Sequence, residues 1–237
     1  MAEAPPDYWR RPDWRAPWLA PYAAVAAPVL ERLERGEPAW RALGLARFVP
    51  QAELPVGEAY EAFIGRTGRV PTRDNLHDLF NGLVWLRFPA LKQRLNALHA
   101  ARLAVEGVQP QRGPLRDALT LFDENGAWWA APAPLADALR RRDWHALFVT
   151  HRSRWSQAMP VLIGHALIEK LATPRKAITA HVWLASHGPE QADAIEPGAW
   201  AAKPFEPLPV LGVPGWWPPN EDEAFYADAS VFRPARG

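Results

Sequence analysis

Residues 69–89 read RVPTRDNLHDLFNGLVWLRFP and place a dense polar cluster on a helix that is too apolar to lie at the surface. Thr72 and Asp74 are capping candidates that follow the turn residue Pro71, so the pattern predicts a helix that begins near Asp74. At about 100° per residue, one broad face is apolar and the opposite face collects polar and aromatic side chains. The apolar face holds Leu76, Leu79, Phe80, Leu83 and Val84, and the other holds Asp74, His77, Asp78, Asn81, Trp85 and Phe88.

The second face is not typical of a solvated surface, which would be rich in Lys, Glu and Gln. It mixes a histidine, carboxylates and an amide with large aromatics, which indicates the wall of a half-buried pocket. A structural interpretation stays open beside this one, because His77 and Asp78 can hydrogen-bond loop backbone and Asp74 can be no more than a cap. Pro89 ends this helix and can occupy the first turn of a second helix, which we expect to run to about Ala104.

Composition excludes several classes of protein. The net charge is +1, and the 27 basic and 26 acidic residues are interspersed, so we expect neither nucleic acid nor a membrane surface as a partner. The chain has no cysteine, which excludes disulfides, thiol catalysis and thiolate metal sites. No stretch approaches the ~20 apolar residues that cross a bilayer, and we expect a soluble, cytoplasmic protein whose oligomeric state is open.

The chain is long enough, and with 49% hydrophobic residues apolar enough, for one large domain over residues 1–237. We expect a helical centre over 56–190, between a proline-rich arm with a helix over 1–55 and a second proline-rich arm over 191–237. Both arms carry several tryptophans. Proline lowers the entropy lost on ordering and tryptophan buries a large area, so the arms are predicted to wrap the core. Alternatively, their aromatics form a surface for a partner.

Residues 118–131 contain Asn125-Gly126 between two apolar runs, a pattern that predicts a β-hairpin with a type I′ turn. Strand alternation would place Leu119, Leu121 and Asp123 on one face and Glu124 on the other. Only one of the two adjacent carboxylates could then enter a site. Asp123 is the better candidate, although it could equally be a plain acid beside a turn.

His165 and Glu169 lie four residues apart in the helix predicted over 160–171, and therefore on one face. This pair can hold a metal ion or orient an imidazole as a base, but a metal site needs a third ligand that the motif does not fix. The chain contains no Gly-rich phosphate loop, no Gly-x-Ser-x-Gly and no His-Glu-x-x-His.

Four strings of the chain resemble the bacterial family catalogued as domain of unknown function 3025. They are residues 71–81, residues 116–126, Gly164-His165 with Glu169, and residues 211–216. The resemblance covers nearly the whole chain and implies that these segments belong to one bacterial single-domain unit. It implies no activity, ligand or cofactor.

The sequence therefore predicts a mainly helical α+β fold, as a single domain with a small antiparallel hairpin or sheet and extended Pro/Trp-rich arms. The first functional hypothesis is a hydrolase-type enzyme for a small molecule or peptide, with a divalent metal as one option for its cofactor. His77 would be the proton-transfer group, and Asp78 or Asp123 would orient its imidazole ring. His165 and Glu169 would form a second acid–base pair or bind the metal, with Asn81, Trp85 and Arg116 contacting substrate.

The alternative hypothesis is a non-catalytic binding or scaffolding protein whose tryptophan-rich arms contact a partner. Spatial convergence discriminates the two, because His77, Asp123 and His165 should meet in one pocket only if the first is right.

Overall fold

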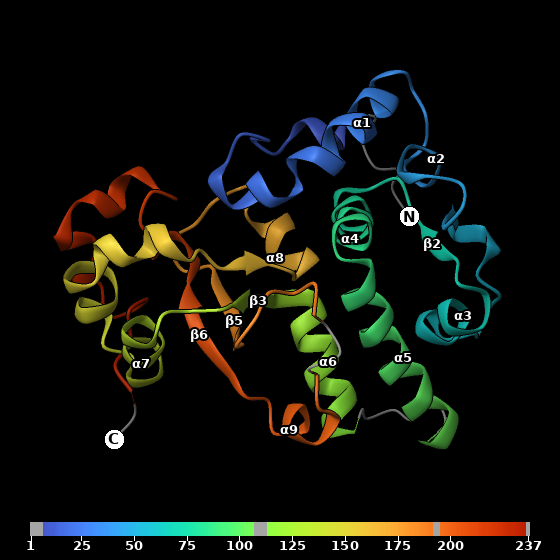
Figure 1. Ribbon diagram of the computed structural model, residues 1–237. Coiled ribbons are helices and arrows are strands. Elements are labelled where there is room, and N and C mark those ends of the chain that lie inside the picture. The colour runs from blue at the N-terminus through green and yellow to red at the C-terminus, as the bar shows by residue number, and fades with distance from the viewer. Residues whose placement is uncertain (1–6, 107–112, 192–194, 236–237) are drawn as a thin grey trace.

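Two consecutive helices, α4 (Leu76–Arg87) and α5 (Pro89–Glu106), run through the middle of the protein (Figure 1). The structure is a computed structural model and describes residues 7–106, 113–191 and 195–235. The expected break at Pro89 is confirmed. The cap of α4 is Asn75, whose side chain accepts a hydrogen bond of 2.8 Å from the backbone N–H of Asp78. Asp74 instead accepts a 2.5 Å hydrogen bond from the backbone N–H of Ala39.

The fold is mainly helical α+β, as predicted, and its other α-helices are short. They are α1 (Ala23–Glu34), α2 (Ala39–Leu43), α3 (Tyr60–Thr67), α6 (Pro114–Asn125), α7 (Ala133–Arg141), α8 (His165–Lys170) and α9 (Pro197–Ala201). Single turns of 3-10 helix connect many of these elements. A π-helical turn at Ala146–Thr150 follows α7.

A four-stranded mixed sheet has the order β4-β3-β5-β6, in which only β3 and β5 are parallel to each other. Its strands are β3 (Gly126–Trp129), β4 (Val161–Leu162), β5 (Thr179–Leu184) and β6 (Phe205–Pro209). A second, two-stranded parallel sheet joins β1 (Phe48–Pro50) to β2 (Val70–Thr72) just before α4. Helices α3 to α5 lie on one side of the four-stranded sheet, and α7 with the C-terminal segment lies on the other (Figure 1).

The hairpin predicted over residues 118–131 is wrong. Helix α6 continues to Asn125, and Gly126, at a φ of −78°, begins β3 rather than occupying a turn. Buried apolar side chains recur at helical spacing in this segment, at Leu115, Leu119 and Phe122. The helical period of 3.6 residues therefore predicts its secondary structure better than the Asn-Gly pair does. Strand β3 pairs with β4 and β5, which come later in the chain.

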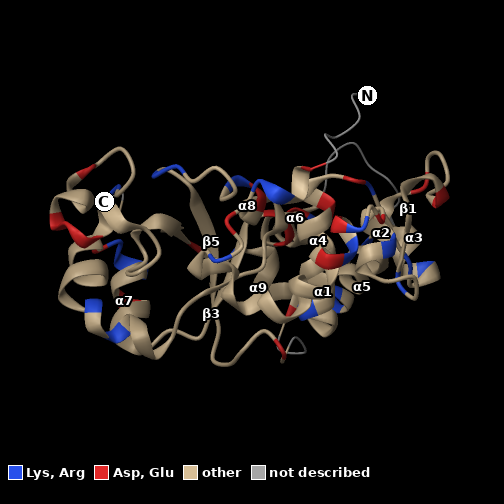
Figure 2. Ribbon diagram, turned by 90° about the horizontal axis from the view of Figure 1, so that it is seen from above, with Lys and Arg blue, Asp and Glu red and all other residues tan. Residues whose placement is uncertain are grey.

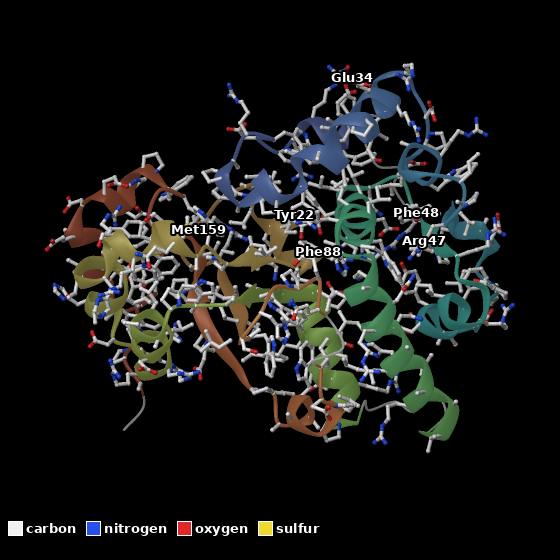
Figure 3. The ribbon with its side chains drawn as sticks, viewed as in Figure 1. Tyr22, Glu34, Arg47, Phe48, Phe88 and Met159 are labelled. Atoms are coloured by element: carbon white, nitrogen blue, oxygen red, sulfur yellow. The ribbon has the colours of Figure 1, made fainter. Side chains whose placement is uncertain are left out.

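The described parts of the two arms pack on the core, in agreement with the first interpretation, while residues 1–6, 192–194 and 236–237 lie outside the described residues. Tyr22 reaches from the N-terminal segment toward Phe88 at the end of α4 (Figure 3), with ring centroids 5.9 Å apart. Its hydroxyl donates a 2.5 Å hydrogen bond to the carbonyl of Leu162 in β4. In the second arm, β6 is an edge strand that continues into buried residues. The fully buried aliphatics there are Leu208, Val210, Leu211 and Val213.

Charged residues of both signs are interspersed over the ribbon (Figure 2), as the composition indicated. Across residues 7–106, 113–191 and 195–235, none of the helices combines the length and the apolar character needed to span a membrane.

Leu208 should contribute strongly to the docking of the second arm, because it is fully buried and lies on β6 opposite Ala180. We expect Leu208→Ala to lower the free energy of unfolding by about 2 to 5 kcal/mol, the range for truncating a buried leucine. Glu206→Ala, on the same strand but half-buried, should change it little. Equal effects of the two substitutions on urea unfolding would contradict the conclusion that this arm packs on the core and stabilises the fold.

Candidate active site

A cavity of about 320 Å³ lies where α3, α4, α5 and α6 meet the first residue of α8. Its polar lining consists of Tyr60 and Glu61 of α3, His77, Asp78 and Asn81 of α4, Lys92, Asn96 and His99 of α5, Thr120, Asp123 and Glu124 of α6, and His165 of α8, together with Gln51 and Arg73 from the connecting segments.

The two predicted histidines meet at the wall of this cavity. The Nε2 atoms of His77 and His165 are 3.1 Å apart, and the rings stand edge to face with centroids 4.5 Å apart. Nδ1 of His77 is 3.1 Å from Oε2 of Glu169. Helix α4 therefore presents an imidazole to the first turn of α8, and Glu169, one turn further along α8, fixes its orientation.

Two adjacent carboxylates of α6 reach the same cavity. Oε1 of Glu124 is 3.5 Å from Nε2 of His165, and Oδ2 of Asp123 is 3.9 Å from its Nδ1. Asp123 also accepts a 2.5 Å hydrogen bond from the ammonium of Lys92, which is 4% exposed. The expectation that only one of these carboxylates could enter a site is wrong, since consecutive residues of a helix diverge by about 100° rather than 180°.

Gly164 allows α8 to approach the end of α6 this closely. A Cβ atom at Gly164 would lie 2.5 Å from the backbone nitrogen of Asn125 and 2.6 Å from the carbonyl oxygen of Glu124. The carbonyl of Gly126 accepts hydrogen bonds of 2.9 Å from the backbone N–H groups of both Ile163 and Gly164. The backbone before His165 is thus anchored directly to the junction that follows Asp123 and Glu124.

The pKa values of the two imidazoles are shifted in opposite directions. The hydrogen bond to Glu169 raises the pKa of His77, although partial burial acts in the other direction. Burial lowers the pKa of His165 to about 3, so this imidazole is neutral near pH 7. A neutral, buried imidazole offers a nitrogen lone pair to a hydrogen-bond donor or a metal ion.

The two carboxylates also differ. Burial raises the pKa of Glu124. Burial alone would raise the pKa of Asp123 too, but the nearby ammonium of Lys92 holds it below its ordinary value. Asp123 is thus a fixed negative charge, while Glu124 is better suited to exchange a proton.

Asp78 lies in the cavity wall but is held by Arg73. This agrees with the structural interpretation, in which Asp78 hydrogen-bonds loop backbone. Its carboxylate accepts hydrogen bonds of 3.0 and 2.9 Å from the guanidinium and 2.7 Å from the backbone N–H of Arg73. His77 points to Glu169 rather than to Asp78, so the structure does not bring Asp78 to the position of an orienting carboxylate.

Asn81 and Trp85 follow His77 at helical spacing and line the cavity, where both are buried. The amide of Asn81 donates a 2.9 Å hydrogen bond to the hydroxyl of Tyr60, and its Oδ1 has no hydrogen-bond partner among the described residues. Arg116, predicted to contact substrate, is buried on α6 but is not among the residues that line the cavity. It precedes Asp123 by seven residues, which is ~10 Å along a helix axis.

Several residues at the cavity were missed in the sequence. Lys92, Asn96 and His99 all line it from α5. Their spacing of four and three places them on one helix face, and this polar stripe was the available signal. If residues 114–125 had been interpreted as a helix, Glu124 would likewise have been a candidate site residue.

Three of these side chains could hold a metal ion together. His77, His165 and Glu124, called the His77–His165–Glu124 cluster below, each offer one ligand atom, and these atoms lie within 4.8 Å of one another. Two imidazoles and a carboxylate are a common donor set for zinc and for non-haem iron.

Comparison with known proteins gives a family but no activity. The model of the family described as "Protein of unknown function (DUF3025)" matches residues 46–236. No curated protein and no solved structure matches the chain.

Gly164→Ala tests the close approach of α8 to α6. Because the nearest atoms are backbone, the substitution should displace the start of α8 and lower the free energy of unfolding by about 1 to 3 kcal/mol, as overpacking does. Gly198→Ala is the control, since a Cβ atom there meets nothing within 4 Å. Urea unfolding of both variants measures the difference, and an unchanged Gly164→Ala protein would contradict the tight junction.

Asp78→Ala tests the structural role of this carboxylate. Loss of its hydrogen bonds at the start of α4 should lower the free energy of unfolding by about 1 to 3 kcal/mol. Asp137→Ala removes a comparable pair with Arg140 that is exposed on α7, and it should have little effect. If thermal unfolding shows the two variants to be equally stable, Asp78 is free for another role.

Proposed function

The chain belongs to the DUF3025 family, and we propose that it is a hydrolase-type enzyme that activates water at the His77–His165–Glu124 cluster. One observation supports this more than any other. Ionisable groups from four helices, α4, α5, α6 and α8, converge at one cavity. A buried set of acid–base groups with shifted pKa values in a concave pocket is typical of an active site.

The proposed reaction is cleavage of an ester or amide bond. A water oxygen held at the cluster adds to the carbonyl carbon, the bond to the leaving group breaks, and the proton lost by the water is passed to that leaving group. Tyr60 stays protonated because burial raises its pKa, and its hydroxyl lies beside Asn81 in the cavity wall. These two groups are suited to orient the polar end of the substrate.

The substrate has room to extend beyond the cluster. A second cavity of about 750 Å³ lies next to the first, and Ile64, Trp85 and Asn96 line both. Its other walls include many small residues of α3 and α5, such as Ala62, Gly65, Ala97 and Ala100. We therefore expect a small molecule or a peptide segment with its polar, reactive end at the cluster and a less polar part beyond Trp85.

The burial of the arms weighs against a scaffolding function. Trp9, Trp18, Trp200 and Trp216 each have at most 6% of their surface exposed. These side chains stabilise the chain's own core and leave little aromatic surface for a partner.

The test is turnover of a panel of carboxylic esters, amides and short peptides by the purified full-length protein. We expect Glu124→Gln to lower kcat/KM by about 100-fold or more, the range for loss of an acid–base group. Glu34→Gln, at the exposed end of α1 (Figure 3), is the matched control and should leave kcat/KM unchanged.

A folded protein that turns over nothing in the panel would overturn the proposal. So would a Glu124→Gln variant that is as active as the Glu34→Gln control.

A further inference from the structure

We infer that one divalent transition-metal ion binds to Nε2 of His77, Nε2 of His165 and Oε1 of Glu124. The inference deepens the proposed function, because it concerns the same cluster and names the group that activates the water. It rests on the positions of these atoms and on the groups that face the other side of each imidazole.

The spacing of the three atoms fits one ion. Two ligands of a tetrahedral zinc ion, each ~2.0 Å from it, lie ~3.3 Å apart. The two Nε2 atoms are 3.1 Å apart, and Oε1 of Glu124 is 3.5 Å from Nε2 of His165. The third pair, His77 and Glu124, lies within 4.8 Å and is the one that must shorten when the ion binds.

The carboxylates behind the two rings favour the required tautomers. Nδ1 of His77 faces Glu169 at 3.1 Å, and Nδ1 of His165 has Asp123 as its nearest carboxylate at 3.9 Å. An N–H at Nδ1 is attracted to these negative charges, whereas a lone pair there would be repelled. A proton on Nδ1 of each neutral ring turns the lone pair of Nε2 toward the cluster. At His77, whose Nδ1 is within hydrogen-bond distance of Glu169, this matches carboxylate–histidine–zinc arrangements. Nδ1 of His165 has no hydrogen-bond partner among the described residues and is attracted to Asp123 at longer range.

The result is a convergence of acceptors. Two nitrogen lone pairs and a carboxylate oxygen lie close together. The side chain of His165 is only 4% exposed, so it is too buried to rotate away into solvent. A positive charge stabilises such an arrangement. A proton on His77 can serve in the metal-free protein, and a divalent ion replaces that proton and adds a second unit of charge.

The ion would remain accessible to substrate. All three ligand residues line the cavity of about 320 Å³, so the remaining coordination positions face that space. An ion with three protein ligands and an open position lowers the pKa of a bound water and polarises a carbonyl, which is the chemistry the proposed function needs. Imidazole donors favour a transition metal over magnesium or calcium, and zinc is the one most suited to hydrolysis.

The experiment measures metal binding in the absence of substrate. Full-length protein is freed of metal with a chelator, and its titration with Zn(II) is followed by calorimetry and its titration with Co(II) by visible absorption. We expect one equivalent of each ion to bind, with a Co(II) spectrum of four- or five-coordinate geometry. Elemental analysis of the protein as purified identifies the ion it carries.

Four variants locate the site. His165→Ala and Glu124→Gln remove a ligand and should weaken binding by 100-fold or more, while Glu169→Gln, which removes only the support of His77, should weaken it by about 10 to 100-fold. His145→Ala, an exposed histidine on the far side of the sheet, is the control and should bind as the unchanged protein does. If His165→Ala does not fold, as judged by circular dichroism, the two glutamate variants carry the test.

The outcomes separate the two proposals. Absence of binding, or equal binding by Glu124→Gln and His145→Ala, overturns the metal site. Hydrolysis that persists in the chelated protein overturns the role of the ion in activating the water and leaves the proposed function standing. One bound ion without any hydrolysis supports the metal site and overturns the proposed function.

Discussion

The contact between the backbone of Gly164 and the end of α6 is the constraint on which the site depends. The carbonyl of Gly126 accepts hydrogen bonds from Ile163 and Gly164, so the segment before α8 is fixed to the point where α6 becomes β3. Glycine is needed because any Cβ would fall within 3 Å of backbone atoms of Glu124 and Asn125. This contact brings His165 against the carboxylates of α6, and the packing of α8 on α4 then brings Glu169 to His77.

A concentration of carboxylates in a half-buried place is costly unless each has a partner. The break between α4 and α5 at Pro89 solves much of this problem, because it turns Lys92 toward Asp123 while His77, about three turns before the break, faces the same cavity. Asp78 is neutralised by Arg73 and Glu169 by His77. Among the described residues, the nearest basic group to Glu124 is the edge of His165, at 3.5 Å, while His77, Lys92 and Lys170 act on it from further away. This weaker pairing distinguishes the cluster from an ordinary network of structural ion pairs.

The accuracy of the sequence-based expectations varied with how local the signal was. The period of α4 correctly gave a helix with a polar face, and His77, Asn81 and Trp85 of that face all line the cavity. The Asn-Gly signal at residues 125–126 outweighed the helical period of α6, and this error removed Glu124 from consideration because a strand would have turned it away. Arg116 was predicted to contact substrate, and nothing local indicated that it would lie two turns away from the carboxylates. Lys92, Asn96 and His99 formed a readable polar stripe that was overlooked.

The sequence by itself determined the elements and the inventory of groups available for chemistry: a mainly helical chain without thiols, two arms too apolar to stay in water, and polar faces on helices that must be buried. Only the tertiary structure decided which of these groups meet. Residues 77, 124 and 165 are separated by more than forty positions at each step, and helical periodicity relates only residues within a few turns of one another. Their meeting depends on how closely α4, α6 and α8 can approach, and that distance is set by the absence of a side chain at Gly164 and by backbone hydrogen bonds that no local pattern specifies.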